Sequence, residues 1–92
     1  MFIYIGNDLV VESTYIISIL DAQLEKTSSK LQRMIKEFEE KDQLHGDKPT
    51  AKSVVITDNA LYYSPLSTLT LKKTKELYQN TIDTNYEMQV NE

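Results

Sequence analysis

The strand-forming segments near the start of the chain are apolar on both faces. The opening MFIYI and the later YIISIL (15–20) both place large apolar side chains at successive positions. A half-buried strand alternates apolar with polar residues, so strands of this kind need cover on both sides. Two short helices cover about one face of such a sheet. We therefore expect the second face to contact another copy of the chain, through Ile3, Ile5, Tyr15, Ile17 and Ile19.

Turn residues and periodicity predict the element order βββαββα. Strands are predicted over residues 1–5, 9–12, 15–20, 52–57 and 60–63, and helices over 28–41 and 66–80. Gly6-Asn7 predicts a type II′ hairpin turn, because Gly accepts a positive φ, and DQLHGDKPT (42–50) has the composition of a loop. Ser64-Pro65 ends the last strand, because Pro cannot donate to a β-ladder. The order predicts a small mixed α+β domain in which antiparallel hairpins pack on two helices.

Charge is distributed unevenly along the chain. Residues 1–75 contain all ten Lys and Arg and ten of the fourteen Asp and Glu, so the net charge of −4 comes from residues 76–92. We expect a single domain over 1–81 and an acidic, flexible tail over 82–92. The absence of cysteine suits the reducing cytoplasm. No apolar run approaches the length that crosses a membrane, so no membrane partner is expected.

Residues that carry catalysis or hold ligands are scarce. His45 is the only histidine, and Gly6 and Gly46 are the only glycines. Acid–base catalysis needs a positioned partner for the histidine, and two separate glycines cannot form a phosphate-cradling loop. The carboxylates of 37–42 are more often a solvated helix face than a metal site. We therefore expect a protein that is not an enzyme and has no cofactor, metal or small-molecule substrate.

Lysines gather around the second predicted hairpin and the helix that follows it. The candidate DNA-binding residues are Lys48, Lys52, Lys72, Lys73 and Lys75. The last three follow a hydroxyl-rich stretch, and a helix N-terminus with free N–H groups and hydroxyls is a natural phosphate contact. Arg33 is the single arginine, so double-stranded DNA would be held mainly through its phosphate backbone and not by reading guanine. An ordinary capped helix followed by solvated lysines remains the plainer interpretation.

Three stretches of the chain form a more specific pattern: MFIYIGNDLVV, STYIISILD and SVVITDNALYYSPLSTLTLKK. They contain an opening strand pair, an Ile-rich strand ending in Asp, and a strand followed by Tyr-x-Ser-Pro, hydroxyl residues and Leu-Lys-Lys. In this order they resemble the small Rem regulators of extracellular-matrix genes in Gram-positive bacteria, in particular their RemB branch. The resemblance covers about residues 1–75, with 21–51 matching only in type.

The resemblance implies a DNA-binding transcriptional regulator of matrix and biofilm genes. The related RemA branch is similar to LytTR-type DNA-binding domains and assembles into rings that engage DNA along a basic edge. That branch has an arginine where this chain has Tyr15, and its paired arginines fall near Pro49-Thr50. Two hypotheses follow: a homo-oligomeric, ring-forming regulator that contacts DNA through the five lysines, or an oligomeric scaffold of the same fold that binds a protein partner and not DNA.

Overall fold

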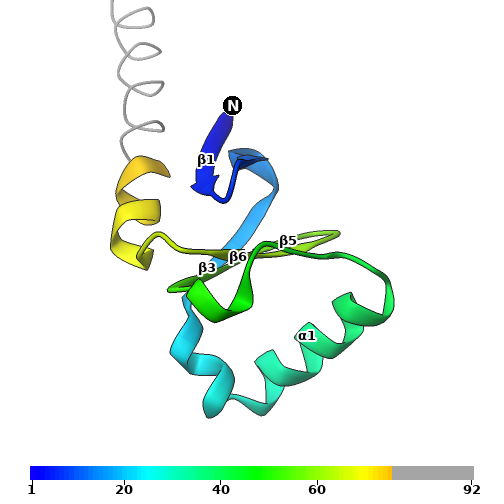
Figure 1. Cartoon of the computed structure of the whole chain (residues 1–92). Helices are drawn as coiled ribbons and strands as arrows, with labels where there is room; N and C mark the ends of the chain where they lie inside the picture. Colours follow the sequence, from blue (N-terminus) through cyan, green and yellow to red (C-terminus); the bar gives the residue numbers. More distant parts are fainter. Residues whose placement is uncertain (76–92) are drawn as a thin grey trace, which may run out of the picture.

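A computed structural model describes residues 1–75, which form two small sheets and two helices arranged in layers. A two-stranded sheet pairs β1 (Phe2–Gly6) with β2 (Leu9–Glu12), and a four-stranded sheet has the strand order β3-β5-β6-β4. Figure 1 shows the four-stranded sheet in the middle, with the hairpin of β1 and β2 on one side and helix α1 on the other. The predicted α+β fold is confirmed.

Apart from one short strand, the remaining elements follow the sequence prediction closely. The strands of the larger sheet are β3 (Ile16–Asp21), β4 (Leu44–His45), β5 (Ser53–Thr57) and β6 (Leu61–Ser64), and α1 spans Ser29–Glu40. The connecting 3-10 turns are η1 (Ser13–Tyr15), η2 (Ala22–Lys26) and η3 (Lys48–Thr50). β3 and β6 both pair antiparallel with β5, and β4 pairs parallel with β6. A second helix occupies 68–75; its predicted end at 80, the domain boundary at 81 and the tail over 82–92 lie outside the described residues.

Both helices begin at a serine cap. The side chain of Ser28 accepts a hydrogen bond from the Leu31 N–H at 3.1 Å, and Ser67 accepts one from the Thr70 N–H at 3.1 Å. Such a cap satisfies one of the N–H groups that the first turn of a helix leaves without a partner. In the described residues 1–75, no helix is long and apolar enough to cross a membrane.

Both faces of the four-stranded sheet are covered by this chain itself. Every residue of β5 is buried, and Val55 belongs to one core cluster while Val54 and Ile56 belong to the other. The first cluster joins the sheet to the inner face of the β1–β2 hairpin and to Leu71 of the second helix; the second cluster joins it to α1. The first hairpin folds over the face that was expected to meet another copy, so that expectation is wrong.

Three of the residues expected at an oligomer interface belong to this core. Ile3, Ile5 and Ile19 are 2%, 1% and 8% exposed and pack together in the cluster between hairpin and sheet. Their side chains are thus occupied within the protomer. Tyr15 and Ile17, from the same expectation, are 60% and 67% exposed, and their contact with another copy stays a prediction.

The turn between β1 and β2 differs from the predicted type II′ turn. Its central residues are Asn7 and Asp8, with φ of 55° and 60°, as in a type I′ turn. Gly6 precedes them at φ 91°, where the register between the two strands shifts. A Cβ at Gly6 would also lie 2.6 Å from the Pro65 ring, so glycine is required both for the bulge and for this close approach.

The segment 42–50, predicted as a loop, contains the short strand β4. Leu44 and His45 pair with Leu61 and Tyr62 of β6. A strand of two residues is too short to show any periodicity, so its pairing is set by the tertiary structure. Gly46 follows at φ 93°, and a Cβ there would lie 2.2 Å from the backbone oxygen of Tyr63; only glycine allows this approach.

Candidate functional site

Two of the predicted DNA contacts, Lys72 and Lys73, lie exposed on the second helix. The helix is anchored by Leu71, which is 2% exposed and packs in the core beneath the hairpin. Successive helix residues are rotated by about 100°, so Lys73 lies opposite the buried face and Lys72 beside it. Lys75, one turn after Leu71, is half-buried. The lysines of this helix therefore spread over more than one face, with Lys72 and Lys73 the most accessible.

Lys52 lies close to the start of the same helix. Its backbone N–H donates to the Ser64 carbonyl at 2.8 Å, which fixes it at the entry to β5. Its side chain shares the lining of a hollow of about 290 Å³ with Ser67 and Thr68. Asp21 lines this hollow too, so Lys52 has an acidic neighbour. The structure thus brings Lys52 together with the hydroxyls that begin the lysine-bearing helix.

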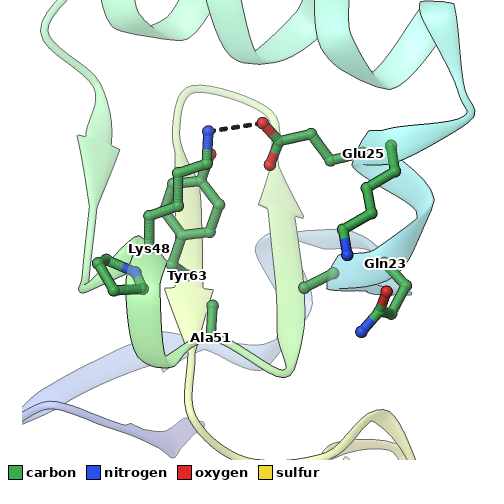
Figure 2. A pocket seen from close by; sticks show the side chains of 8 residues that line it. Gln23, Glu25, Lys48, Ala51 and Tyr63 are labelled. Carbon is green, nitrogen blue, oxygen red and sulfur yellow. Dashed lines mark ion pairs between the residues drawn. The ribbon is translucent and has the colours of Figure 1, made fainter.

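Lys48 is engaged with a carboxylate. Its ammonium lies 2.7 Å from Glu25 of η2, as the dashed line in Figure 2 shows. The hydrogen bond to Glu25 raises the pKa of Lys48 above its ordinary value. Lys48 lines a second hollow, of about 460 Å³, which shares Ala22, Gln23 and Ala51 with the first. Lys48 and Lys52 therefore lie at neighbouring hollows, but Lys48 is already paired.

Tyr63 forms part of the wall of the larger hollow. It is 4% exposed, and among the described residues its buried hydroxyl has no hydrogen-bond partner. Burial, and then the nearby charge of Glu25, raise the pKa of Tyr63 above its ordinary value. The hydroxyl is therefore a neutral donor. Periodicity places Tyr62 and Tyr63 on opposite faces of β6, but it gives no sign that one of them lacks a partner.

His45, the one candidate acid–base residue, is part of the packing around β6. It is half-buried in β4, and its ring stacks on Tyr62 with the ring centroids 5.1 Å apart. Within 1–75 the structure contains no group of three His, Cys, Asp or Glu side chains that could hold a metal ion.

Large exposed apolar side chains concentrate in the first seventeen residues. Each of the following is more than half exposed: Phe2, Tyr4, Val10, Tyr15 and Ile17. Tyr4 and Val10 lie directly opposite each other in the β1–β2 ladder, so they share the outer face of the hairpin. The sequence prediction identified Tyr15 and Ile17 but missed the outer hairpin face, because both faces of β1 are equally apolar in sequence.

The comparisons with known proteins agree with this fold and this pattern of residues. Residues 2–74 match the RemA-like family, described as extracellular matrix regulatory protein A-like. The chain is also 39% identical over 77 residues to extracellular matrix regulatory protein B of Bacillus subtilis (strain 168). This match covers 79% of this chain and 88% of the relative. The matched region includes every strand described above and the lysine-bearing helix up to 74. The chain therefore belongs to the RemA-like family and resembles its RemB-type members.

Proposed function

We propose that the protein is a transcriptional regulator of extracellular-matrix genes that acts as a homo-oligomer and contacts the phosphate backbone of DNA. The family and the printed name of the relative support the regulatory role. The observation that carries the DNA contact is the charge of one segment: residues 59–75 contain three lysines and no acidic residue. Lys72 and Lys73 are exposed there, on a helix that begins beside Lys52. The protein acts by binding and not by catalysis.

The outer face of the β1–β2 hairpin supports self-association. Phe2, Tyr4 and Val10 expose 69%, 56% and 56% of their surfaces, while the inner face of the same hairpin is filled by the core. Burying a large apolar side chain contributes about 1.5–3 kcal/mol. Contact between copies through these side chains would therefore be stabilised by their burial. A closed ring of copies would repeat the exposed lysines of the second helix, Lys72 and Lys73, around its circumference. This repetition would raise DNA affinity through avidity.

A gel-shift titration with long duplex DNA tests the DNA contact. Three to five lysines per protomer would give a log–log salt slope of about −3 to −4.5 per bound subunit, and a ring would give a steeper slope. Failure to shift long duplex DNA even at about 50 mM salt, where phosphate contacts are strongest, would show that the protein does not act by binding DNA.

Charge reversal on the second helix tests which residues make the contact. Replacing Lys72 and Lys73 together by Glu should abolish the shift and leave the fold and mass unchanged, because both side chains are exposed. The matched control replaces Lys30 and Lys36 of α1 by Glu, which changes the net charge equally at exposed positions of another element. Equal loss of binding in both double variants would mean that net charge, and not the helix surface, governs binding.

Light scattering tests the assembly. We expect a mass well above the 10.6 kDa of one chain at micromolar concentration, and a wild-type mass near that value would refute self-association. Tyr4→Glu should disperse the oligomer into folded protomers, because Tyr4 faces outward. Ile3→Glu should instead unfold the protomer, because a carboxylate buried in the core has no partner.

A second candidate is an oligomeric scaffold of the same fold that binds a protein partner and not DNA. The pairing of Lys48 with Glu25 favours it. The resemblance to the RemA branch, which implies an arginine where this chain has Tyr15, favours it as well. The exposed apolar side chains of the hairpin would then serve the partner. Oligomerisation without a DNA shift would select this function.

A further inference from the structure

The hollow beside Tyr63 and Lys48 has the properties of a ligand site. We propose that it binds a small organic molecule bearing a carboxylate or phosphate group. An oxygen of that group would accept a hydrogen bond from the Tyr63 hydroxyl and lie between the ammonium groups of Lys26 and Lys48. This inference does not rest on DNA binding or on the oligomeric state.

The size and lining of the hollow suit a metabolite. Its volume of about 460 Å³ lies within the range of about 300–1,000 Å³ that small-molecule pockets occupy. Pro49, Ala51 and the Tyr63 ring contribute apolar surface. Figure 2 shows Tyr63 and Lys48 on one side of the hollow and Gln23 on the other, with Glu25 between them at one end and Ala51 at the opposite end. A few polar groups around an apolar floor are the usual composition of a binding pocket.

The Tyr63 hydroxyl provides the specific requirement for a ligand. It is buried, and within the described part of the chain it has no hydrogen-bond partner. Buried hydroxyls in proteins are nearly always hydrogen-bonded, so one without a partner needs an explanation. Burial favours the protonated form of this side chain and raises its pKa. The hydroxyl therefore needs an acceptor, and an anionic oxygen is the strongest kind of acceptor.

The charges around the hollow favour an anion. Lys26 and Lys48 contribute two positive charges and Glu25 one negative charge, so the lining sums to +1. Glu39, outside the lining, also acts on Lys48 and Tyr63. The Glu25 carboxylate forms an ion pair with the Lys48 ammonium at 2.7 Å. The Lys48 side chain is 60% exposed, so a ligand anion can reach its ammonium from solvent. A ligand anion would therefore compete with Glu25 for Lys48 while taking the hydrogen bond of Tyr63.

NMR titration of the full chain tests the site. The probes are citrate, a carboxylate, and ribose 5-phosphate, a phosphate ester, each added at constant ionic strength against a sodium chloride control. We expect saturable shifts confined to amides around η2, η3 and Tyr63, and the probe that produces them identifies the anionic group. A probe concentration of about 10 mM is high enough to detect binding with a Kd near 1 mM. The proposal is overturned if neither probe produces such shifts at that concentration. Shifts spread over the surface, or equal in sodium chloride, overturn it as well.

Three variants test the arrangement within the hollow. Tyr63→Phe should weaken binding about ten- to hundredfold, the range for a hydrogen bond to a charged group, without lowering stability, because the hydroxyl has no partner in the described structure. Tyr62→Phe is the matched control and should bind as the wild type does, since Tyr62 packs on His45. Glu25→Gln should tighten binding about three- to tenfold by releasing Lys48. Unchanged affinity in Tyr63→Phe, or weaker binding in Glu25→Gln, would overturn the proposal.

Discussion

Replacing Ser64 by Ala tests how the β1–β2 hairpin is held on the main sheet. Ser64 is fully buried at the end of β6. Its hydroxyl donates to the Ile5 carbonyl at 2.5 Å and accepts from the Leu66 N–H at 3.1 Å. One side chain thus satisfies an acceptor in the first hairpin and a donor at the approach to the second helix.

The cost of this substitution follows from the two backbone groups left behind. A buried donor or acceptor that loses its partner costs about 1–3 kcal/mol, so the loss of two partners in Ser64→Ala should lower the free energy of unfolding by about 2–6 kcal/mol. The free energy of unfolding of a whole domain is about 5–15 kcal/mol. The control is Ser67→Ala, which removes a helix cap near the surface and should cost about 1 kcal/mol.

Urea unfolding of the two variants measures this difference. Both are measured at equal protein concentration, because the proposed association would also contribute to stability. Hydrogen exchange then locates the effect: the amides of β1 and β2 should lose protection in Ser64→Ala before those of α1 do. A Ser64→Ala variant no less stable than Ser67→Ala would refute the reasoning that this hydroxyl fastens the hairpin.

Three further predictions concern the core and its buried groups. Gly46→Ala should cost more than about 3 kcal/mol or prevent folding, since it combines a positive φ with a contact of 2.2 Å to the Tyr63 carbonyl; near wild-type thermal stability would contradict this. Leu31→Ala should cost about 2–5 kcal/mol in urea, because Leu31 is 3% exposed against the sheet, whereas a cost near zero would mean that α1 does not pack there. The pKa of Tyr63 is raised on folding, so as pH rises above about 10 the unfolded chain loses this proton first and stability falls. Tyr63→Phe should lack this part of the alkaline loss, and identical alkaline unfolding curves would contradict the shift.

Local pattern was enough to predict most of the secondary structure. Helix α1 is strongly periodic, with Leu31 and Ile35 buried on one face and a serine cap before it, and its predicted bounds differ from the observed ones by one residue at each end. The hairpin of β5 and β6 is bounded by turn residues and by Ser64-Pro65, so its position was also predictable. These features depend on neighbours within a few residues, which the sequence displays directly.

The way the elements pack could not be predicted in the same way. Strand periodicity shows that Ile3 and Ile5 share one face of β1 while Phe2 and Tyr4 share the other, but both faces are apolar. Nothing local decides which face turns inward. The structure buries the two isoleucines and exposes the aromatic residues, because the hairpin packs its isoleucines against Val55. The assignment depends on the tertiary contact and not on the strand itself.

The candidate site depends on residues that are far apart in sequence. Lys48 and Glu25 are separated by α1 and β4, and each is an ordinary exposed charge by sequence. Their pairing beside Tyr63 follows only when η2 and η3 are brought together at one end of the sheet. The sequence places Lys48 near the second hairpin, but it does not show that this charge is paired with Glu25.

Folding of the protomer does not depend on the proposed assembly. The strands with two apolar faces predicted a sheet that needs another copy to cover it. In such a protein, a substitution that breaks the contact between copies would also unfold the protomer. The hairpin now supplies that cover from within the chain, and its isoleucines complete the core of the protomer. Contact between copies through the outer side chains would add burial to a core that is already closed. A change at Tyr4 should therefore act on assembly, and a change at Ile3 on folding.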